Sequence, residues 1–360
     1  MTVARSFPSS APADHALAEQ PAPTQLLTLL QLARQRQASD VHWHSGQVPW
    51  LRVMGELSPL SSETAQNWVL AAEPMQRLLR AVLSPSLWTR FDDGLEVDAA
   101  WSWPGLGRYR VNVFRHESGC GMVMRCIGDT VPSLDDLRVP TGLLPLLSGS
   151  GLILVTGPTG SGKSTTLAAM LHHLNVHRAS HILTLEDPIE YLHPCMRSLV
   201  TQREIGRDSP SFAHALRAAL REDPDVLLVG EMRDLETIRL ALTAAETGHL
   251  VLASLHSRHA AGAIDRIIDV FEATEKALIR TQLAEALRGV VAQTLYPRAD
   301  GSGRCALFEL LVATPAVRNL IRENKTPQIA SAMQIGGSHG MVTFAQARHD
   351  ALQKGHIPPV

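Results

Sequence analysis

The stretch Gly157-Pro-Thr-Gly-Ser-Gly-Lys-Ser164 decides the fold of this 360-residue chain. It matches the pattern G-x-x-x-x-G-K-[ST], it follows the apolar run Gly151-Leu-Ile-Leu-Val155, and it opens a predicted helix. Its three glycines let the backbone curl so that successive N–H groups face phosphate oxygens, and the helix N-terminus adds a favourable dipole. Strand, glycine-rich loop and helix in this order predict a nucleotide-binding loop, against the alternative of a chance glycine-rich turn.

Each residue of this loop has a predicted part in binding ATP. Lys163 would reach the β- and γ-phosphates, and Ser164 would be a ligand of Mg²⁺. An enzyme that uses ATP and Mg²⁺, either a nucleotide triphosphatase or a kinase, is therefore the leading class of function. The predicted binding residues are Gly157, Pro158, Thr159, Gly160, Ser161, Gly162, Lys163, Ser164 and Thr165.

Around this loop, in residues 141–360, short apolar runs alternate with segments of helical periodicity. Such alternation indicates an α/β domain with a parallel sheet, which binds ligands beyond the C-terminal ends of its strands. The spacing of apolar residues also predicts one long helix over Ala277–Leu295, with Leu287 and Val290 on its buried face. The four apolar runs are Leu152–Thr156, Ile182–Leu185, Val226–Val229 and Leu250–Leu255.

The preceding part of the chain predicts a second, smaller domain, since 360 residues correspond to about two domains of roughly 150 residues. Residues 25–127 combine a helical segment with short strand-like runs around turns, which indicates an α+β domain. Residues 128–140 contain two prolines and three aspartates and are predicted to be a linker. Residues 1–24 are predicted to be a flexible Pro/Ala-rich tail. The expected strands are 41–44, 50–54, 95–101, 108–114 and 121–127.

Composition argues against several classes of protein. Lys and Arg total 33 and Asp and Glu total 35, so the formal charge of −2 argues against a polybasic nucleic-acid binder. No apolar run approaches the ~18 residues that span a bilayer, and the tail lacks the apolar core of a secretory signal. The four cysteines form no C-x-x-C pair, which favours reduced thiols in a cytoplasmic protein over a zinc ribbon.

Acidic residues follow two of the predicted strands at the sheet edge that carries the phosphate loop. Glu186-Asp187-Pro188-Ile189-Glu190 follows one strand, and Glu231 follows another, directly after Gly230. Phosphoryl transfer needs a second anchor for the metal and a group that positions the attacking water, and Glu190 and Glu231 are the candidates. An apolar strand that ends in Gly-Glu is typical of a Walker B motif. Glu186 and Asp187 have an alternative role as helix caps.

Two histidines flank the fourth predicted strand, His249 before it and His256 at its end. At ~3.3 Å per residue they lie roughly 23 Å apart, so they cannot both contact one γ-phosphate. His256 belongs to the edge with the phosphate loop and is the candidate sensor of nucleotide state. For His249, a contact with another domain or subunit and a purely structural role are both open.

Four motifs in this order resemble the secretion ATPases of type II secretion and type IV pili, and within them the PilT-like retraction motors. The resemblance covers about residues 25 to 345 and includes Ala38-Ser-Asp-Val-His42 near the N-terminus. The motifs are the Walker A motif Gly157–Thr165, the aspartate box Thr184–Glu190, the Walker B motif Val226–Asp234 and the histidine box Thr247–His256.

The resemblance implies a hexameric ring whose subunits each have a PAS-like N-terminal domain and a RecA-like ATPase domain. It implies that Glu190 polarises the attacking water and that Glu231 helps to hold Mg²⁺. Arginines of the N-terminal domain are implied to close on the nucleotide, where they stabilise the charge that develops on the γ-phosphate. The matching candidates are Arg110 and Arg125, with Arg108 next, and the alternative is that these are solvent-facing strand arginines. The resulting catalytic set is Glu190, Glu231, Lys163, Arg110, Arg125 and His256, with Ser164 and Glu231 as metal ligands.

The segment Ala316–Glu323 concerns whether such a motor retracts or extends a pilus. It differs from the A-I-R-N-L-I-R-E signature of retraction ATPases only at Val317, and by itself it predicts an amphipathic helix that exposes Arg318 and Arg322 together. The resemblance thus favours an ATPase for pilus retraction, cytoplasmic and peripheral at the inner membrane. Its implied partners are an inner-membrane platform protein and a second pilus ATPase, with no direct nucleic acid. The alternatives are an accessory nucleotide-binding subunit of a pilus motor, or a secretion or DNA-transfer ATPase of the same superfamily.

Overall fold

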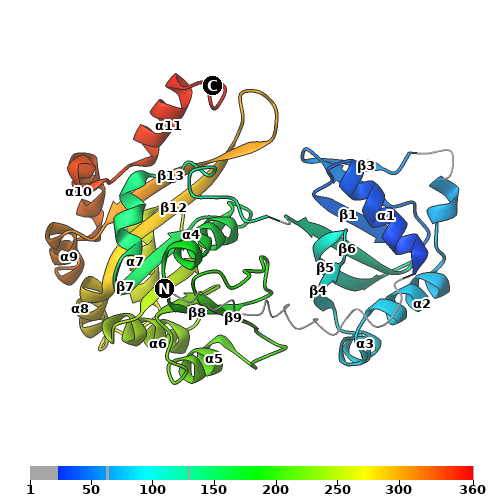
Figure 1. Ribbon diagram of the computed structural model, residues 1–360, viewed down its shortest axis with the longest axis horizontal. Coiled ribbons are helices and arrows are strands. Elements are labelled where there is room, and N and C mark those ends of the chain that lie inside the picture. The colour runs from blue at the N-terminus through cyan, green and yellow to red at the C-terminus, as the bar shows by residue number, and fades with distance from the viewer. Residues whose placement is uncertain (1–22, 62–64, 129, 360) are drawn as a thin grey trace, which may run out of the picture. The chain divides into compact units, whose positions relative to one another are not determined.

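The computed structural model describes residues 23–61, 65–128 and 130–359 (Figure 1). The chain divides into two compact units, Met1–Asp129 and Thr130–Val360, and each unit has its own sheet. The predicted tail, residues 1–24, lies outside the described residues except for Pro23 and Thr24, where the first helix begins.

The first unit is an antiparallel sheet with helices packed against one face, which is the predicted α+β arrangement. Its six strands lie in the order β3-β2-β1-β6-β5-β4. Alternate residues such as Val111 and Val113 are fully buried against the helices, because successive side chains of a strand point to opposite faces. The strands are β1 (Asp40–His44), β2 (Trp50–Val53), β3 (Glu56–Pro59), β4 (Val97–Trp103), β5 (Gly107–His116) and β6 (Gly119–Ile127), and the helices are α1 (Thr24–Gln35), η1 (Ala65–Trp68), α2 (Ala72–Val82) and α3 (Pro85–Asp92).

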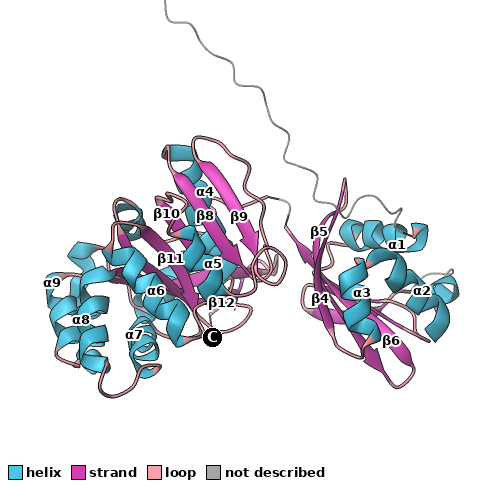
Figure 2. Ribbon diagram, turned by 90° about the horizontal axis from the view of Figure 1, so that it is seen from below, coloured by secondary structure: helices cyan, strands magenta, loops and turns pink. Residues whose placement is uncertain are grey.

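The second unit has a seven-stranded sheet with the order β13-β12-β7-β11-β10-β8-β9. Figure 2 labels its strands β8 to β12. Its strands are parallel except for β13, which pairs antiparallel with β12. The strands are β7 (Gly151–Thr156), β8 (His181–Glu186), β9 (Leu199–Glu204), β10 (Val226–Val229), β11 (Leu250–Leu255), β12 (Leu287–Pro297) and β13 (Arg304–Val312). The helices are η2 (Thr141–Leu147), α4 (Lys163–His177), α5 (Phe212–Ala219), α6 (Leu235–Glu246), α7 (Ala260–Asp269), α8 (Lys276–Ala286), α9 (Pro315–Arg322), η3 (Thr326–Gln328), α10 (Ile329–Ile335), η4 (Gly336–His339) and α11 (Phe344–Gln353).

Helices cover both faces of this sheet, which confirms the predicted α/β class. Leu152 and Leu154 of β7 pack into the core on the side of α5 to α8, whereas Ile153 and Val155 pack into the core on the side of α4. The register places the C-terminal ends of the parallel strands at one edge, since Thr156 of β7 pairs with the last residue of β11. The loops that follow these strands therefore meet at a single edge.

The long helix predicted over Ala277–Leu295 is wrong. The helix α8 ends at Ala286, and the chain continues directly as β12, which pairs with β7 on one side and β13 on the other. At Gly289 an added Cβ would lie 2.6 Å from Leu146 Cδ1, so neighbouring elements occupy the space that a side chain would need. Apolar residues at Leu287 and Val290 satisfy a buried strand as well as a helix, and periodicity alone does not distinguish the two.

Residues 130–140, which the sequence predicts as part of a linker, belong to the second unit. Leu134 is buried in the core that also contains residues of η2 and α4, and Leu137 and Val139 pack against the same core. Among the described residues, no helix combines the length and the apolar character needed to cross a lipid bilayer.

Candidate active site

The phosphate loop connects the buried strand β7 to the N-terminus of α4. Gly162 precedes the first residue of α4 with φ +87°, a conformation that residues with a Cβ rarely adopt. At Gly157 an added Cβ would lie 2.4 Å from the Gln293 carbonyl oxygen and 2.5 Å from Ser161 Oγ. Within the described residues, the buried hydroxyl of Ser161 has no hydrogen-bond partner, which fits a loop that a phosphate group completes.

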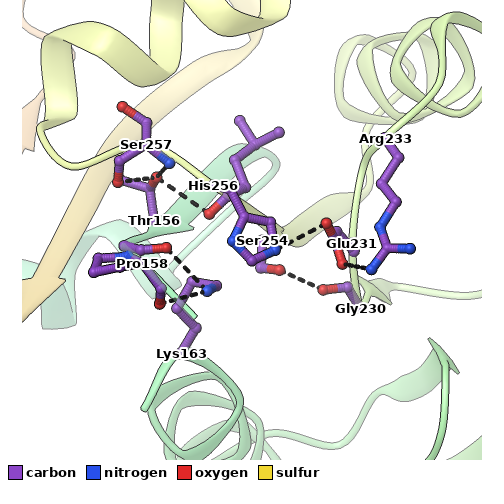
Figure 3. Close-up of polar contacts among 11 residues, drawn as sticks. Thr156, Pro158, Lys163, Gly230, Glu231, Arg233, Ser254, His256 and Ser257 are labelled. Carbon is purple, nitrogen blue, oxygen red and sulfur yellow. Dashed lines mark hydrogen bonds and ion pairs between the residues drawn. The ribbon is translucent and has the colours of Figure 1, made fainter. Parts of the chain in front are cut away.

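Lys163 lies at the start of α4, and its side chain turns back over the loop (Figure 3). Its Nζ donates to the carbonyl oxygens of Gly157 at 3.0 Å and Pro158 at 3.1 Å. Burial lowers the pKa of Lys163, and the charges of Glu231 and Glu190 oppose that shift. The ammonium group is thus in the electrostatic field of both predicted catalytic carboxylates.

The side chain of Gln293 in β12 forms hydrogen bonds with the phosphate loop and with α4. Its Nε2 donates to the Ser161 carbonyl oxygen at 2.7 Å, and its Oε1 accepts from Thr166 Oγ1 at 2.7 Å. The Gln293 side chain is almost completely buried, so it links the loop and α4 to the sheet rigidly. Sequence reasoning missed this residue because it assigned Gln293 to the interior of a long helix.

Glu231, directly after Gly230 and β10, lies between two basic side chains (Figure 3). Its Oε1 is 3.0 Å from His256 Nε2, and its Oε2 accepts from Arg233 Nη2 at 2.7 Å. Burial by itself favours the neutral carboxyl group, but the hydrogen bond and charge of Arg233, with the charges of His256 and Lys163, hold the pKa of Glu231 below its ordinary value. Glu231 is therefore held as a carboxylate that faces the phosphate loop.

His256 directly follows β11, and its side chain reaches the Glu231 carboxylate. The loop after β11 is fixed to the phosphate-loop strand, because Thr156 Oγ1 accepts from the Ser257 N–H at 2.8 Å. His249 precedes β11, and its Nδ1 lies 2.9 Å from the Ala244 carbonyl oxygen at the end of α6. Arg233 is a further residue that the sequence analysis missed, although it lies within the Walker B motif that was quoted.

The segment that carries Glu190 follows β8 and contains no helix in residues 187–211, all of which the structure describes. Glu186 and Asp187 therefore cap no helix. The carboxyl group of Glu186 instead accepts from Thr184 Oγ1 at 2.7 Å and Gln202 Nε2 at 3.2 Å. Burial raises the pKa of Glu186 to about 7, although these two hydrogen bonds lower it.

The Glu190 segment also contacts the first turn of α4. Tyr191 directly follows Glu190, and its hydroxyl oxygen lies 3.1 Å from Thr165 Oγ1. Thr165 was predicted only as the last residue of the phosphate loop, so this bond adds a link between the aspartate box and the Walker A motif. Glu190, Glu231 and Lys163 thus lie at one edge of one sheet.

The predicted arginines belong to the first unit. Arg110 of β5 and Arg125 of β6 are directly opposite each other in the antiparallel pair. Arg125 Nε donates to Asp40 Oδ1 at 2.9 Å, and Arg52 Nε lies 3.9 Å from Asp40 Oδ2. Asp40 is buried, whereas the side chain of Arg125 is 66% exposed, so this arginine has a structural partner. Contact of Arg108, Arg110 or Arg125 with nucleotide stays a prediction.

The predicted exposure of Arg318 and Arg322 is only partly right. Arg318 donates to the carbonyl oxygens of Ala313 at 3.0 Å, Glu285 at 2.7 Å and Leu287 at 3.1 Å. It thereby satisfies the C-terminal end of α8, where carbonyl groups lack partners within the helix. Arg322 is exposed and pairs with Glu285. This helix therefore has a structural role that its amphipathic pattern did not indicate.

Ser164 and Glu231 supply the kind of ligand that Mg²⁺ prefers, namely oxygen atoms beside a phosphate site. The Ser164 side chain is exposed in the first turn of α4, and Glu231 is held as a carboxylate at the same edge. These donors fit the predicted metal, which keeps several of its water ligands and binds through few protein groups.

Comparisons with known proteins match the chain to one family of ATPases. A family model described as "Type II/IV secretion system protein" matches residues 141–356. The chain is 47% identical over 330 residues to the type IV pilus retractation ATPase PilT of Pseudomonas aeruginosa, which covers 91% of this chain and 94% of that protein. It is 47% identical over 312 residues to a twitching motility protein of Neisseria gonorrhoeae, with 86% and 82% coverage. The crystal structure of the pilus retraction motor PilT with bound ADP is similar at a TM-score of 0.83, with 41% identity and coverage of 92% and 94%.

Proposed function

This chain belongs to the family of type II/IV secretion system proteins and is an ATPase, and from that premise we propose that it is a motor that retracts type IV pili. The observation that carries the proposal is its 47% identity to a retraction ATPase over 91% of the chain. The site supports it, because Lys163, Glu231 and His256 lie together at the edge where nucleotides bind in such sheets.

In the proposed reaction, the loop N–H groups and Lys163 bind the phosphates, and Glu190 orients the attacking water for displacement of the γ-phosphate. Mg²⁺ supplies positive charge that offsets the charge on the phosphate oxygens when Ser164 and Glu231 hold it. His256 contacts Glu231 at 3.0 Å, so we assign it the sensing of nucleotide state through that carboxylate.

Arginines of the PAS-like first unit complete the proposed site. Arg110 and Arg125 would stabilise the charge that develops on the γ-phosphate. Arg125 donates to Asp40 through Nε, so the proposed contact with nucleotide would use the N–H groups of its two Nη atoms. We further propose that the motor is a homohexamer, cytoplasmic and peripheral at the inner membrane. Its proposed partners are a membrane platform protein and a second pilus ATPase.

The test is Mg²⁺-dependent phosphate release by the purified protein as a function of its concentration, beside Lys163→Ala. We expect specific activity that rises with protein concentration and is absent in the variant, because assembled subunits share each site. If the wild type binds ATP but releases no phosphate at any concentration, the accessory-subunit alternative replaces the motor.

A second experiment tests retraction itself. The chain is expressed in a piliated bacterium whose own retraction ATPase has been deleted, and the recovery of twitching on a surface is measured. We expect wild type but not Lys163→Ala to restore movement. Tight, salt-sensitive binding of DNA to the purified protein would instead favour a DNA-transfer ATPase.

A further inference from the structure

The edge strand β9 places two polar side chains against the segment that carries Glu190. Gln202 and Glu204 are two residues apart and therefore lie on the same face of the strand. Gln202 Oε1 accepts from the His193 N–H at 2.8 Å, and Gln202 Nε2 donates to the Tyr191 carbonyl oxygen at 2.8 Å. Glu204 Oε2 accepts from the Ile189 N–H at 3.1 Å.

These hydrogen bonds bracket Glu190 along the chain. Ile189 directly precedes Glu190 and is held by Glu204, whereas Tyr191 directly follows it and is held by Gln202. Residues 187–198 contain neither helix nor strand, so no ladder of backbone hydrogen bonds fixes this segment. The side chains of β9 take the place of such a ladder.

Glu186 joins the two strands to the same segment. Its carboxyl group accepts from Gln202 Nε2 at 3.2 Å, and Gln202 in turn donates to the Tyr191 carbonyl oxygen. Gln202 is thus shared between the Glu186 carboxyl group and two backbone groups that follow Glu190, the Tyr191 carbonyl oxygen and the His193 N–H. An amide is suited to this place, because it donates two hydrogen bonds with its NH₂ group and accepts with its oxygen.

We propose that Gln202, together with Glu204, is a positioning residue for ATP hydrolysis that fixes the backbone on both sides of Glu190. This inference rests on the proposed role of Glu190 in orienting the attacking water. Misplacement of a reacting group by about 1 Å lowers a rate by as much as 10²-fold, whereas binding of the nucleotide depends on the separate phosphate loop. Loss of Gln202 should therefore lower kcat and leave KM for ATP nearly unchanged.

The main variant is Gln202→Met, which keeps the length of the side chain but makes none of its hydrogen bonds. We expect kcat to fall at least about 10-fold, with KM for ATP and the affinity for ADP within about twofold of wild type. The matched control is Thr201→Val on the same strand. It removes the contact of Thr201 Oγ1 with His181 Nε2 at 3.1 Å, on the other face of β9, and should leave kcat unchanged.

Glu204 provides an independent pair of variants that also covers the case in which Gln202→Met fails to fold. Glu204→Gln retains an oxygen that accepts from the Ile189 N–H and should keep near wild-type kcat. Glu204→Met lacks that oxygen and should lose kcat without a matching change in KM. Equal activity in these two variants would overturn the proposal, as would a normal kcat in Gln202→Met.

The double variant Glu190→Gln/Gln202→Met separates the inference from the proposed function. If Gln202 acts through Glu190, the double variant is no slower than Glu190→Gln alone, because the positioned group is already absent. A further loss of kcat in the double variant would show that Gln202 acts by another route and would overturn the inference. Full activity of Glu190→Gln alone would instead refute the role of Glu190, whatever Gln202→Met does.

Discussion

The phosphate loop and the Glu190 segment lie at the same edge of one sheet, but they are held by different kinds of group. The phosphate loop lies between the buried strand β7 and α4, and glycine geometry with the buried Gln293 fixes its shape. Residues 187–198, which carry Glu190, contain neither helix nor strand, and side chains of β9 hold them. Binding should therefore depend on the backbone of one region, and hydrolysis on the side-chain network of the other.

Lys163→Ala changes the phosphate loop and should have the largest effect on ATP binding and turnover. Loss of charge-assisted hydrogen bonds worth ~1.5–3 kcal/mol should weaken ATP binding at least about 10-fold and abolish turnover. Nucleotide affinity and phosphate release are measured on the same preparation. Lys276→Ala, which removes a surface ion pair with Asp269, is the control and should behave as wild type.

Glu190→Gln should impair hydrolysis alone and leave ATP binding intact. The amide keeps the shape of the side chain but cannot accept a proton, so kcat should fall about 10²–10⁴-fold while ATP affinity stays near the wild-type value. Single-turnover hydrolysis and equilibrium binding test the two halves separately. If Glu190→Gln weakened ATP binding as much as Lys163→Ala does, the two regions would not have separate roles.

Glu186→Gln should change how the stability of the protein depends on pH. Because burial raises the pKa of Glu186 to about 7 from 4.5, the folded protein retains a proton that the unfolded chain has lost between these values. Wild type therefore loses stability as pH rises through that window, and the neutral glutamine does not. We expect the variant to be more stable by about 3 kcal/mol above pH 7, with the smallest difference below pH 4.5.

Chemical denaturation of both proteins from pH 4 to pH 8 measures this difference. If the free energies of unfolding of wild type and variant differ by the same amount at every pH, burial does not raise the pKa of Glu186. In this variant the amide oxygen of the new glutamine still accepts from Gln202 Nε2, so the hydrogen bonds of Gln202 are kept.

Arg233→Ala should have the smallest effect. Removal of its hydrogen bond and charge raises the pKa of Glu231, so the acidic limb of the profile of kcat against pH should move to higher pH. Above that limb, kcat should stay within about fivefold of wild type, since an exposed ion pair contributes at most about 1 kcal/mol. Arg217→Ala, which breaks a surface pair with Glu236, is the control, and an opposite displacement of the limb would contradict the assignment.

Sequence patterns predicted the parts of the fold that local chemistry dictates. The Walker A loop, the α+β and α/β classes and four of the buried strands follow from glycine spacing and from short apolar runs. The helix over Ala277–Leu295 was wrong because Leu287 and Val290 serve a strand that is buried between β7 and β13. That environment depends on residues far away in the chain, so local periodicity cannot reveal it.

The same division holds for the site. By itself the sequence predicted site roles for Lys163, Glu231 and His256, because each lies at the end of a recognisable strand or in a loop of fixed pattern. Only the tertiary structure decided that His256 contacts Glu231, that Arg125 is bonded to Asp40, and that Gln293 and Gln202 hydrogen-bond to the phosphate loop and to the segment with Glu190. A polar side chain on a strand has no distinctive local pattern, since its partner is chosen by the pairing of strands and not by its neighbours in sequence.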